Sequence, residues 1–189
     1  MATATKPEPT VKRSVCERYD VRTGKNSEWA IIMLDERGGI LQICSDFGNW
    51  SYNWPYHGRE SFKHFIVELG RDTDYLTRKL AGEPDRYLPD ETVRGCRDEI
   101  LRQRKEREIE KAVARKAWDY LDGTDDLDTE AQLIEAVYDS PALTKVFGEE
   151  PWESISFKKD YRTGIRQFIE RLWPVFVEAI RKEITDGNS

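Results

Sequence analysis

The spacing of apolar residues changes character near Gly58. Between about residues 14 and 54, apolar and polar side chains tend to alternate, which is the period of a strand with one buried face. Beyond Gly58, apolar side chains return every three or four positions, which is the period of a helix with one buried side. The sequence therefore predicts an α+β fold, with the sheet first and the helices after it.

Four strands are expected in the first part of the chain. They run through Val15, Tyr19 and Val21, and then over residues 29–34, 40–45 and 50–54. The second of them, WAIIML, is nearly all apolar, which is typical of a central strand covered on both faces. Because the connections are short, we expect a four-stranded antiparallel meander, packed by the helices that follow.

Capping residues and glycines divide the rest of the chain. The expected helices cover residues 62–69, 72–82, 90–121, 129–138 and 157–184, with an irregular segment over 140–156. Asp90 is the expected cap of the long helix, and Thr129 with Gln132 fits a capping box. The middle of the long helix, RQRKERE, has no apolar residue and should stand in solvent. Pro174 should kink the last helix or divide it in two.

These elements suggest three parts. Residues 1–12 contain Pro7 and Pro9 and no apolar pattern, so we expect a flexible tail. Residues 13–88 form the expected α+β sheet domain. Residues 89–189 form an all-helical C-terminal half, either separate from the sheet domain or continuous with it.

Charge is unevenly distributed along the chain. The net charge is −6, and residues 124–189 carry 8 basic against 14 acidic side chains, whereas the two preceding thirds are balanced. This argues against general nucleic-acid binding by the last third, because phosphate contacts need clustered lysine and arginine. With 35% charged residues, we expect long exposed helices.

Cysteine usage and the absence of apolar runs indicate the compartment. Cys16, Cys44 and Cys96 are odd in number and form no CxxC pair, which favours reduced thiols in the cytoplasm. The N-terminus has no apolar signal region, and no run is long enough to span a membrane. We expect a soluble, intracellular protein.

The stretch SDFGNWSYNW is the most conspicuous in the sequence. Trp50, Tyr52 and Trp54 share one face of the fourth strand, either as part of the core or as an exposed stacking platform. The helices that follow need an apolar surface to cover, which favours the core. The outward-facing rim is then the predicted partner-binding site, formed by Asp46, Asn49, Asn53, Tyr56, His57 and Arg59.

Recognisable catalytic chemistry is absent from the sequence. Phosphate-binding glycine loops, HExxH and GxSxG do not occur, and His57 and His64 are too few and too far apart to suggest a zinc site. The acidic stretch 122–130 lacks the glycine and terminal glutamate of a calcium loop. It caps helices or, as the less favoured alternative, forms an acidic patch for a basic partner. We predict no catalytic residues, no metal and no cofactor.

One block of the sequence resembles a known family. The residues are Ser45 to Tyr52 (SDFGNWSY), then Trp54, Gly58, Phe62, Phe65, Asp74 to Leu76 (DYL), Lys79 and Leu80. In this pattern, residues 29–82 are similar to a family of small accessory proteins of bacteriophages and prophages. The resemblance implies a viral accessory protein in the host cytoplasm, and it carries over no activity and no catalytic residue.

The leading hypothesis is a non-catalytic phage accessory protein that binds a host or defence-system protein. Two alternatives remain beside it. The first is a nucleic-acid-binding module that uses Trp50, Tyr52, Trp54, Arg102, Arg104, Lys105 and Arg107. The second is a small enzyme that acts on nucleic acid, with Asp46 and His57 at its site. Self-association through the long helix is also expected, and a membrane partner is not.

Overall fold

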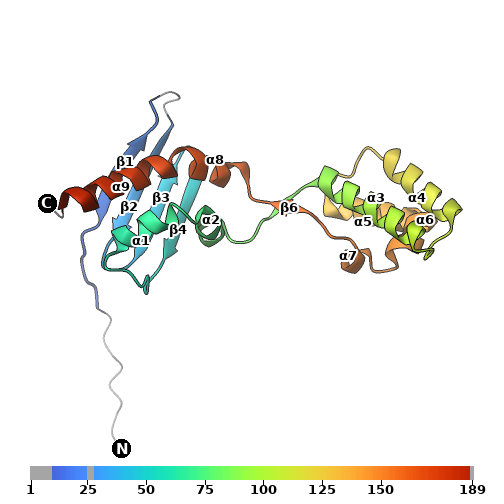
Figure 1. The fold of residues 1–189 in the computed structure, drawn as a ribbon, viewed down its shortest axis with the longest axis horizontal. Helices are drawn as coiled ribbons and strands as arrows, with labels where there is room; N and C mark the ends of the chain where they lie inside the picture. Colours follow the sequence, from blue (N-terminus) through green and yellow to red (C-terminus); the bar gives the residue numbers. More distant parts are fainter. Residues whose placement is uncertain (1–9, 25–27, 188–189) are drawn as a thin grey trace, which may run out of the picture. The chain divides into compact units, whose positions relative to one another are not determined.

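The computed structural model describes residues 10–24 and 28–187, which form two compact units. The sheet unit comprises Met1–Gly82 and Thr163–Ser189, and the helical unit comprises Glu83–Arg162 (Figure 1). The helical unit is therefore inserted into the sequence of the sheet unit. The tail expected over residues 1–12 lies outside the described residues except for its last three.

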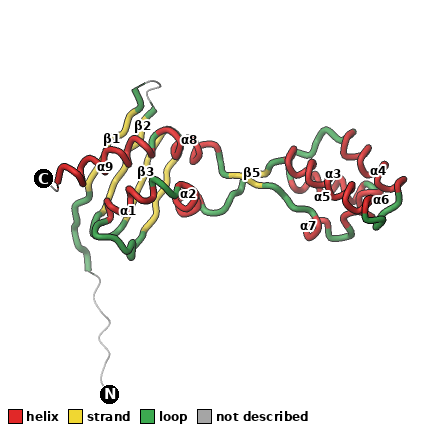
Figure 2. Tube along the Cα trace, viewed as in Figure 1, coloured by secondary structure: helices red, strands yellow, loops and turns green. Residues whose placement is uncertain are grey.

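The sheet is the predicted four-stranded antiparallel meander, in the order β1-β2-β3-β4 (Figure 2). The strands are β1 (Glu17–Arg22), β2 (Trp29–Asp35), β3 (Ile40–Ser45) and β4 (Gly48–Asn53). Ile32 lies opposite Tyr19 on one side and Ile43 on the other. Val15, expected in the first strand, precedes β1 and is 89% exposed.

One face of the sheet is covered by helices from both segments of the sheet unit (Figure 1). They are α1 (Phe62–Leu69), α2 (Thr73–Ala81), α8 (Thr163–Arg171) and α9 (Trp173–Gly187). The Asp72 side chain caps α2, and Gly82 ends that helix with a positive φ of 76°, as the sequence predicts. The Ser61 side chain caps α1. The core side chains are Ile32, Leu34, Leu41, Ile43, Phe62, Ile66, Leu76, Phe168, Trp173, Phe176 and Ile180.

The expectation that β2 is covered on both faces is wrong. Its burial alternates, with Ala30, Ile32 and Leu34 buried and the intervening Trp29, Ile31 and Met33 only half-buried. The described helices of the sheet unit lie on the first of these faces. An all-apolar strand therefore leaves a partly exposed apolar stripe on the other face.

The helical unit contains α3 (Pro89–Lys105), α4 (Lys111–Asp122), α5 (Glu130–Asp139), α6 (Pro141–Phe147) and α7 (Pro151–Ser154). Strands β5 (Arg86–Tyr87) and β6 (Lys159–Asp160) pair where the chain enters and leaves the unit. The capping box of Thr129 and Gln132 is confirmed at the start of α5. The core includes Cys96, Ile100, Ala117, Leu121, Leu133, Val137, Leu143 and Phe147.

The single long helix expected over residues 90–121 is wrong, because the chain turns between α3 and α4. The turn contains Arg107 with a positive φ of 62°. Folding back buries Ile100 of α3 together with Ala114 and Ala117 of α4, which a continuous helix would hold apart. The predicted self-association relied on one continuous helix, which the structure replaces with α3 and α4. Leu88 rather than Asp90 is the N-cap of α3.

Two further expectations for the C-terminal half need correction. Residues 140–156 are not irregular: Ser140 caps α6 and Pro141 begins it, since proline is tolerated in a first helical turn. The helix expected over 157–184 is replaced by β6, α8 and α9, and the division near Pro174 follows one of the two predicted outcomes. Helices α8 and α9 belong to the sheet unit, so the C-terminal half does not form one helical region.

The helices were compared with the length and apolar character of a membrane span. None of those in the described part of the chain has the length and apolar character needed to cross a bilayer.

Candidate functional site

The helix-free side of the sheet is the strongest candidate for a binding surface, and we call it the open face. Strand register assigns it thirteen residues: Arg18, Asp20, Arg22, Trp29, Ile31, Met33, Asp35, Ile40, Gln42, Cys44, Asn49, Ser51 and Asn53. Each alternates along its strand with a residue that faces the helices.

The open face has an apolar centre and a polar rim. Trp29, Ile31 and Met33 of β2 are half-buried, and Ile40 of the neighbouring β3 is 38% exposed. The rim is formed by the polar side chains of β4 and by the Arg18–Asp20 ion pair of β1, with 2.6 Å between Nη1 and Oδ2. An apolar patch inside a polar, solvated border is the usual anatomy of a protein–protein interface.

Part of the predicted partner-binding rim lies on or beside this face. Asn49 and Asn53 are exposed on β4 and belong to the open face. Asp46 lies in the turn between β3 and β4, where its Oδ2 accepts a hydrogen bond of 2.9 Å from the Trp29 amide. Asp46 thus has a local structural role at the edge of the open face.

The other predicted rim residues follow β4 and approach α1. His57 packs against Phe62, with 5.5 Å between ring centroids, and Arg59 forms an ion pair of 2.5 Å with Glu68. Tyr56 is 96% exposed. The six residues expected at one rim are therefore divided between the open face and the loop beside α1.

The aromatic row of β4 lies against the helices and forms part of the core. Trp54 is only 5% exposed, and its Nε1 donates to the Tyr75 hydroxyl at 3.1 Å. Trp50 contacts Phe168, with 5.4 Å between ring centroids, and Tyr52 packs against Trp54 at 4.5 Å. Packing occupies these rings, so the favoured interpretation of the row as core agrees with the structure.

The basic segment of the nucleic-acid alternative belongs to the helical unit, whereas the aromatic strand belongs to the sheet unit. Arg102 pairs with Glu99 at 2.6 Å, with Glu108 at 3.1 Å and with Glu106. The Arg102 guanidinium lowers the pKa of the Glu99 carboxyl. Arg104, Lys105 and Arg107 are exposed at the end of α3 and in the turn. Arg102 is consequently neutralised locally and is poorly suited to bind phosphate.

A cluster of ionisable side chains joins β1, α1 and α9. Lys63 Nζ lies 2.7 Å from Glu17 and 3.0 Å from Glu183, and the Tyr19 hydroxyl donates to both carboxylates. Burial tends to raise the pKa of Glu17, but hydrogen bonds from Lys63 and Tyr19 lower it overall. Burial and the hydrogen bonds to Glu17 and Glu183 raise the pKa of the Tyr19 hydroxyl. Burial tends to lower the pKa of Lys63, but its hydrogen bonds to the same two carboxylates raise it overall. Tyr19 and Lys63 both stay protonated near neutral pH, so the cluster is suited to hold the elements together and not to accept protons.

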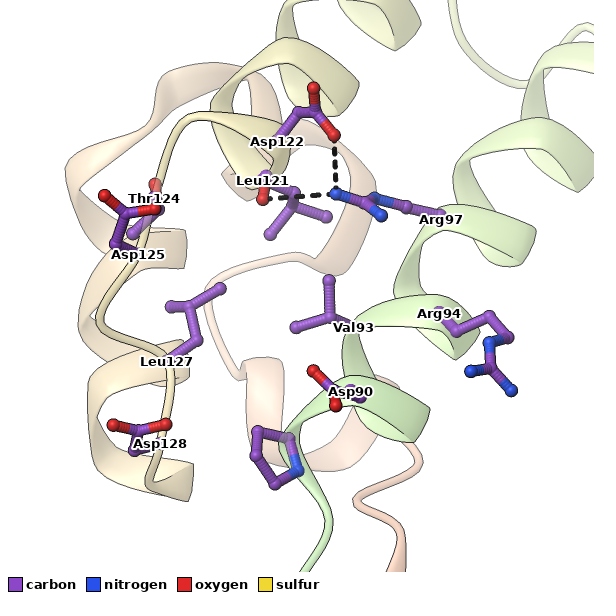
Figure 3. Close-up of a pocket in the computed structure, with 11 residues that line it drawn as sticks. Asp90, Val93, Arg94, Arg97, Leu121, Asp122, Thr124, Asp125, Leu127 and Asp128 are labelled. Atoms are coloured by element: carbon purple, nitrogen blue, oxygen red, sulfur yellow. Dashed lines mark hydrogen bonds and ion pairs between the residues drawn. The ribbon is translucent and has the colours of Figure 1, made fainter.

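The helical unit contains an acidic hollow of about 430 Å³, shown in Figure 3. Four aspartates line it: Asp90, Asp122, Asp125 and Asp128. Arg97 donates to Asp122 at 2.9 Å, whereas the Arg94 side chain points away (Figure 3). The described residues include no group of three or more His, Cys, Asp or Glu side chains that could hold a metal ion.

Sequence reasoning found part of this hollow. The acidic stretch 122–130 was a candidate patch, but Asp90 and Arg97 were not associated with it. They join it only because α3 and α4 form a hairpin, which the sequence did not reveal. The favoured role of the stretch, helix termination and capping, agrees with its position between α4 and α5.

A comparison with protein families decides where the chain belongs. The model of the phage family Phage_phiTE_072 matches residues 9–182. The chain belongs to this phage family. The match extends through both compact units, whereas the resemblance in the sequence block covered residues 29–82 only. The family match supports the phage origin, and it does not test the SDFGNWSY block separately.

No curated protein and no solved structure matches the chain. Family membership therefore establishes a phage protein and leaves its activity to be argued from the surfaces described above.

Proposed function

We propose that this phage protein is a non-catalytic accessory protein that binds a host or defence-system protein through the open face, in the host cytoplasm. The observation that supports this is the apolar centre of a sheet face that no described helix of its unit covers. An exposed apolar patch promotes aggregation unless a partner covers it. In soluble proteins such a patch commonly marks an interaction site.

The charge of the open face favours a protein over a nucleic acid. Its basic residues are Arg18 and Arg22, and its acidic residues are Asp20 and Asp35, so the face carries no net charge. Nucleic-acid affinity depends on clustered cations that neutralise phosphates. A balanced rim around an apolar centre is better suited to a protein surface.

The dimensions of the face suggest how much of a partner it can hold. Four strands about 4.8 Å apart and six or seven residues long present a face of roughly 19 by 20 Å. A helix with its side chains is about 10–12 Å wide, so one or two helices of a partner would cover the face. We expect such contact to bury Ile31 and Met33.

The main test uses two substitutions at similarly exposed apolar positions. Ile40→Glu places a charge on the open face, and Val175→Glu places one on α9, where Val175 is 45% exposed against 38% for Ile40. In pull-downs from host lysate, the wild type and Val175→Glu should recover the same stoichiometric partner, and Ile40→Glu should lose it. Recovery of no stoichiometric partner by the wild type, or equal recovery by Ile40→Glu, would contradict the proposal.

Native cysteines provide an independent measurement. Cys44 lies on the open face and is exposed, Cys16 is exposed just before β1, and Cys96 is buried. Burial raises the pKa of the Cys96 thiol to about 12, so this cysteine should react slowly. The captured partner should protect Cys44 from alkylation and leave Cys16 reactive. Unchanged Cys44 labelling in the complex would place the partner elsewhere.

One observation keeps the nucleic-acid alternative open to test. Arg104, Lys105 and Arg107 are exposed, and none of them has an ion-pair partner among the described residues. This alternative predicts salt-dependent binding to DNA or RNA that weakens on charge reversal at Arg104. Absence of binding at low salt would eliminate it. The enzymatic alternative would be abandoned if Asp46→Ala and His57→Ala left the biological activity unchanged.

A further inference from the structure

A second hollow of the helical unit, lined mainly by apolar side chains, lies between α3 and α4. Its volume is about 410 Å³, and its lining consists of Ile100, Leu101, Lys111, Ala114, Arg115 and Trp118. Ile100 and Ala114 are buried, Leu101 is 53% exposed and Trp118 is half-buried. We call this hollow the α3–α4 groove.

The groove exists because α4 presents small side chains to α3. Ala114 lines the hollow beside Ile100 and is buried in the core of the unit, and alanine fills little of the space beside a leucine or a tryptophan. Leu101 consequently keeps more than half of its surface exposed, although it borders the buried Ile100. An exposed leucine and a half-buried tryptophan beside one hollow offer an apolar site to an inserted side chain.

The two ionisable side chains that line the groove are cationic, although Arg115 also forms an exposed ion pair with Asp119, with 3.0 Å between Nε and Oδ2. Lys111 and Arg115 are its only ionisable lining residues, and the Arg97 guanidinium lies 5.4 Å from the centroid of the Trp118 ring. Lys111 is exposed at the first position of α4, where the helix dipole disfavours a cation. In the described part of the chain, Lys111 has no ion-pair partner. The stability of α4 therefore does not explain why a lysine stands at position 111.

We propose that the α3–α4 groove binds an acidic amphipathic helix of a partner protein. An apolar side chain of that helix would insert between Leu101 and Trp118, and a carboxylate beside it would pair with Lys111, while a second would share Arg115 with Asp119. Amphipathic helices commonly bind grooves in this way, with apolar anchors one helical turn apart and charges along the edge. This surface lies in the helical unit and goes beyond the open face, so the two proposals can fail separately.

The first test measures binding to defined peptides. The probe is a synthetic peptide of about 15 residues, with leucines on one helical face and glutamates elsewhere. Its matched control replaces every glutamate with lysine. Fluorine NMR of the full chain made with fluorotryptophan reports the site, and a Trp118→Phe variant assigns the resonance of Trp118. We expect the acidic peptide to shift that resonance and the basic peptide to leave it in place.

The second test reverses one charge in the groove. Lys111→Glu should weaken binding of the acidic peptide about fivefold or more, which exceeds the effect of one exposed ion pair because attraction becomes repulsion. Glutamate is favourable at the start of a helix, so this variant should keep α4 folded. Lys116→Glu is the matched control, because Lys116 is exposed on α4 and does not line the groove. Its affinity should remain within about twofold of wild type.

Several outcomes would overturn the inference. They are equal binding of both peptides, no shift of the Trp118 resonance, or equal weakening by Lys111→Glu and Lys116→Glu. A shift caused only by single-stranded DNA would assign the groove to nucleic acid. A concentration-dependent shift without peptide, abolished by Leu101→Glu, would assign it to a second copy of the chain. Ile40→Glu should not change peptide binding, so failure of the open-face proposal remains distinguishable.

Discussion

The sheet unit and the helical unit differ in how the chain builds them. The sheet unit combines two segments that are far apart in sequence, and its core rings meet across that separation: Trp50 contacts Phe168, and Tyr19 contacts Phe176 at 5.2 Å. The helical unit is one continuous segment whose neighbouring helices pack on each other. Local contacts form with a smaller loss of chain entropy than distant ones. The helical unit should therefore fold independently of the segment that completes the sheet unit.

The first and last residues of the helical unit are joined to each other by ion pairs and by the β5–β6 ladder. Arg86 pairs with Asp160 at 3.0 Å, and Arg162 pairs with Asp85 at 2.6 Å. The hydrogen bond from Arg162 lowers the pKa of the Asp85 carboxyl. These pairs and the β5–β6 ladder hold the entry and exit of the inserted segment together, so the segments on either side can meet in one sheet unit.

The largest expected effect comes from removing the segment after the insertion. A chain that ends at Arg162 loses α8 and α9, with the buried Phe168, Trp173 and Phe176. We expect the sheet unit to lose its fold, because its buried face becomes exposed, while the helical unit keeps its structure. Amide hydrogen exchange measured by NMR will distinguish the units. Persistent protection of the β2 and β3 amides in the truncated chain would refute this dependence.

A smaller effect is expected from single core cavities, one in each unit. Phe168→Ala should destabilise the sheet unit by about 3–5 kcal/mol, and Leu133→Ala the helical unit by about 2–5 kcal/mol, since both side chains are fully buried. Each substitution should increase hydrogen exchange in its own unit. If Leu133→Ala increased exchange in the sheet to the same extent, the two units would have to be regarded as one cooperative structure.

The same glycine substitution should have opposite effects in the two units. A Cβ at Gly164 would lie 2.1 Å from the Phe47 carbonyl oxygen, so Gly164→Ala should destabilise the sheet unit by about 1–3 kcal/mol. A Cβ at Gly95, inside α3, would have no atom within 4 Å, so Gly95→Ala should stabilise the helical unit by about 0.5–1 kcal/mol. Thermal unfolding measures both. A Gly164→Ala variant at least as stable as wild type would show that the close approach of α8 to the β3–β4 turn is not constrained.

The smallest expected effect is a dependence of stability on pH. The pKa of Glu17 is lowered in the folded protein, so its stabilisation is present above its ordinary value of 4.5 and is lost as pH falls below it. The pKa of Lys63 is raised, so its stabilisation is lost only as pH rises above 10.5. Glu17→Gln should reduce the stability that is lost on the acid side by less than about 1 kcal/mol, because the carboxylate is partly exposed.

Denaturant titrations at several pH values will measure this loss of stability. Glu99→Gln is the matched substitution in the helical unit, where the lowered pKa arises from the local Arg102 contact. It should reduce the loss less than Glu17→Gln does, because it does not join distant elements. An equal reduction would mean that the ionisable cluster joining β1, α1 and α9 contributes no more stability than a local ion pair.

Much of the fold and part of the site follow from local signals. The alternation in β3 and β4 correctly separates Ile43 and Trp50 from Asn49 and Asn53, because strand period alone determines the face. The caps of α2 and α5 are likewise predicted, since a side chain and an amide three residues away suffice. The open face was missed because an all-apolar β2 is equally compatible with one or two covered faces.

By itself, the sequence determined the α+β class, the meander and the position of the aromatic row against the helices. The tertiary structure decided that the apolar stripes of α3 and α4 face each other in a hairpin, because periodicity cannot say whether two stripes lie on one helix or two. It also decided that α8 and α9 complete the sheet unit. Burial of Phe168 against Trp50 depends on contacts between distant residues, which no local pattern encodes.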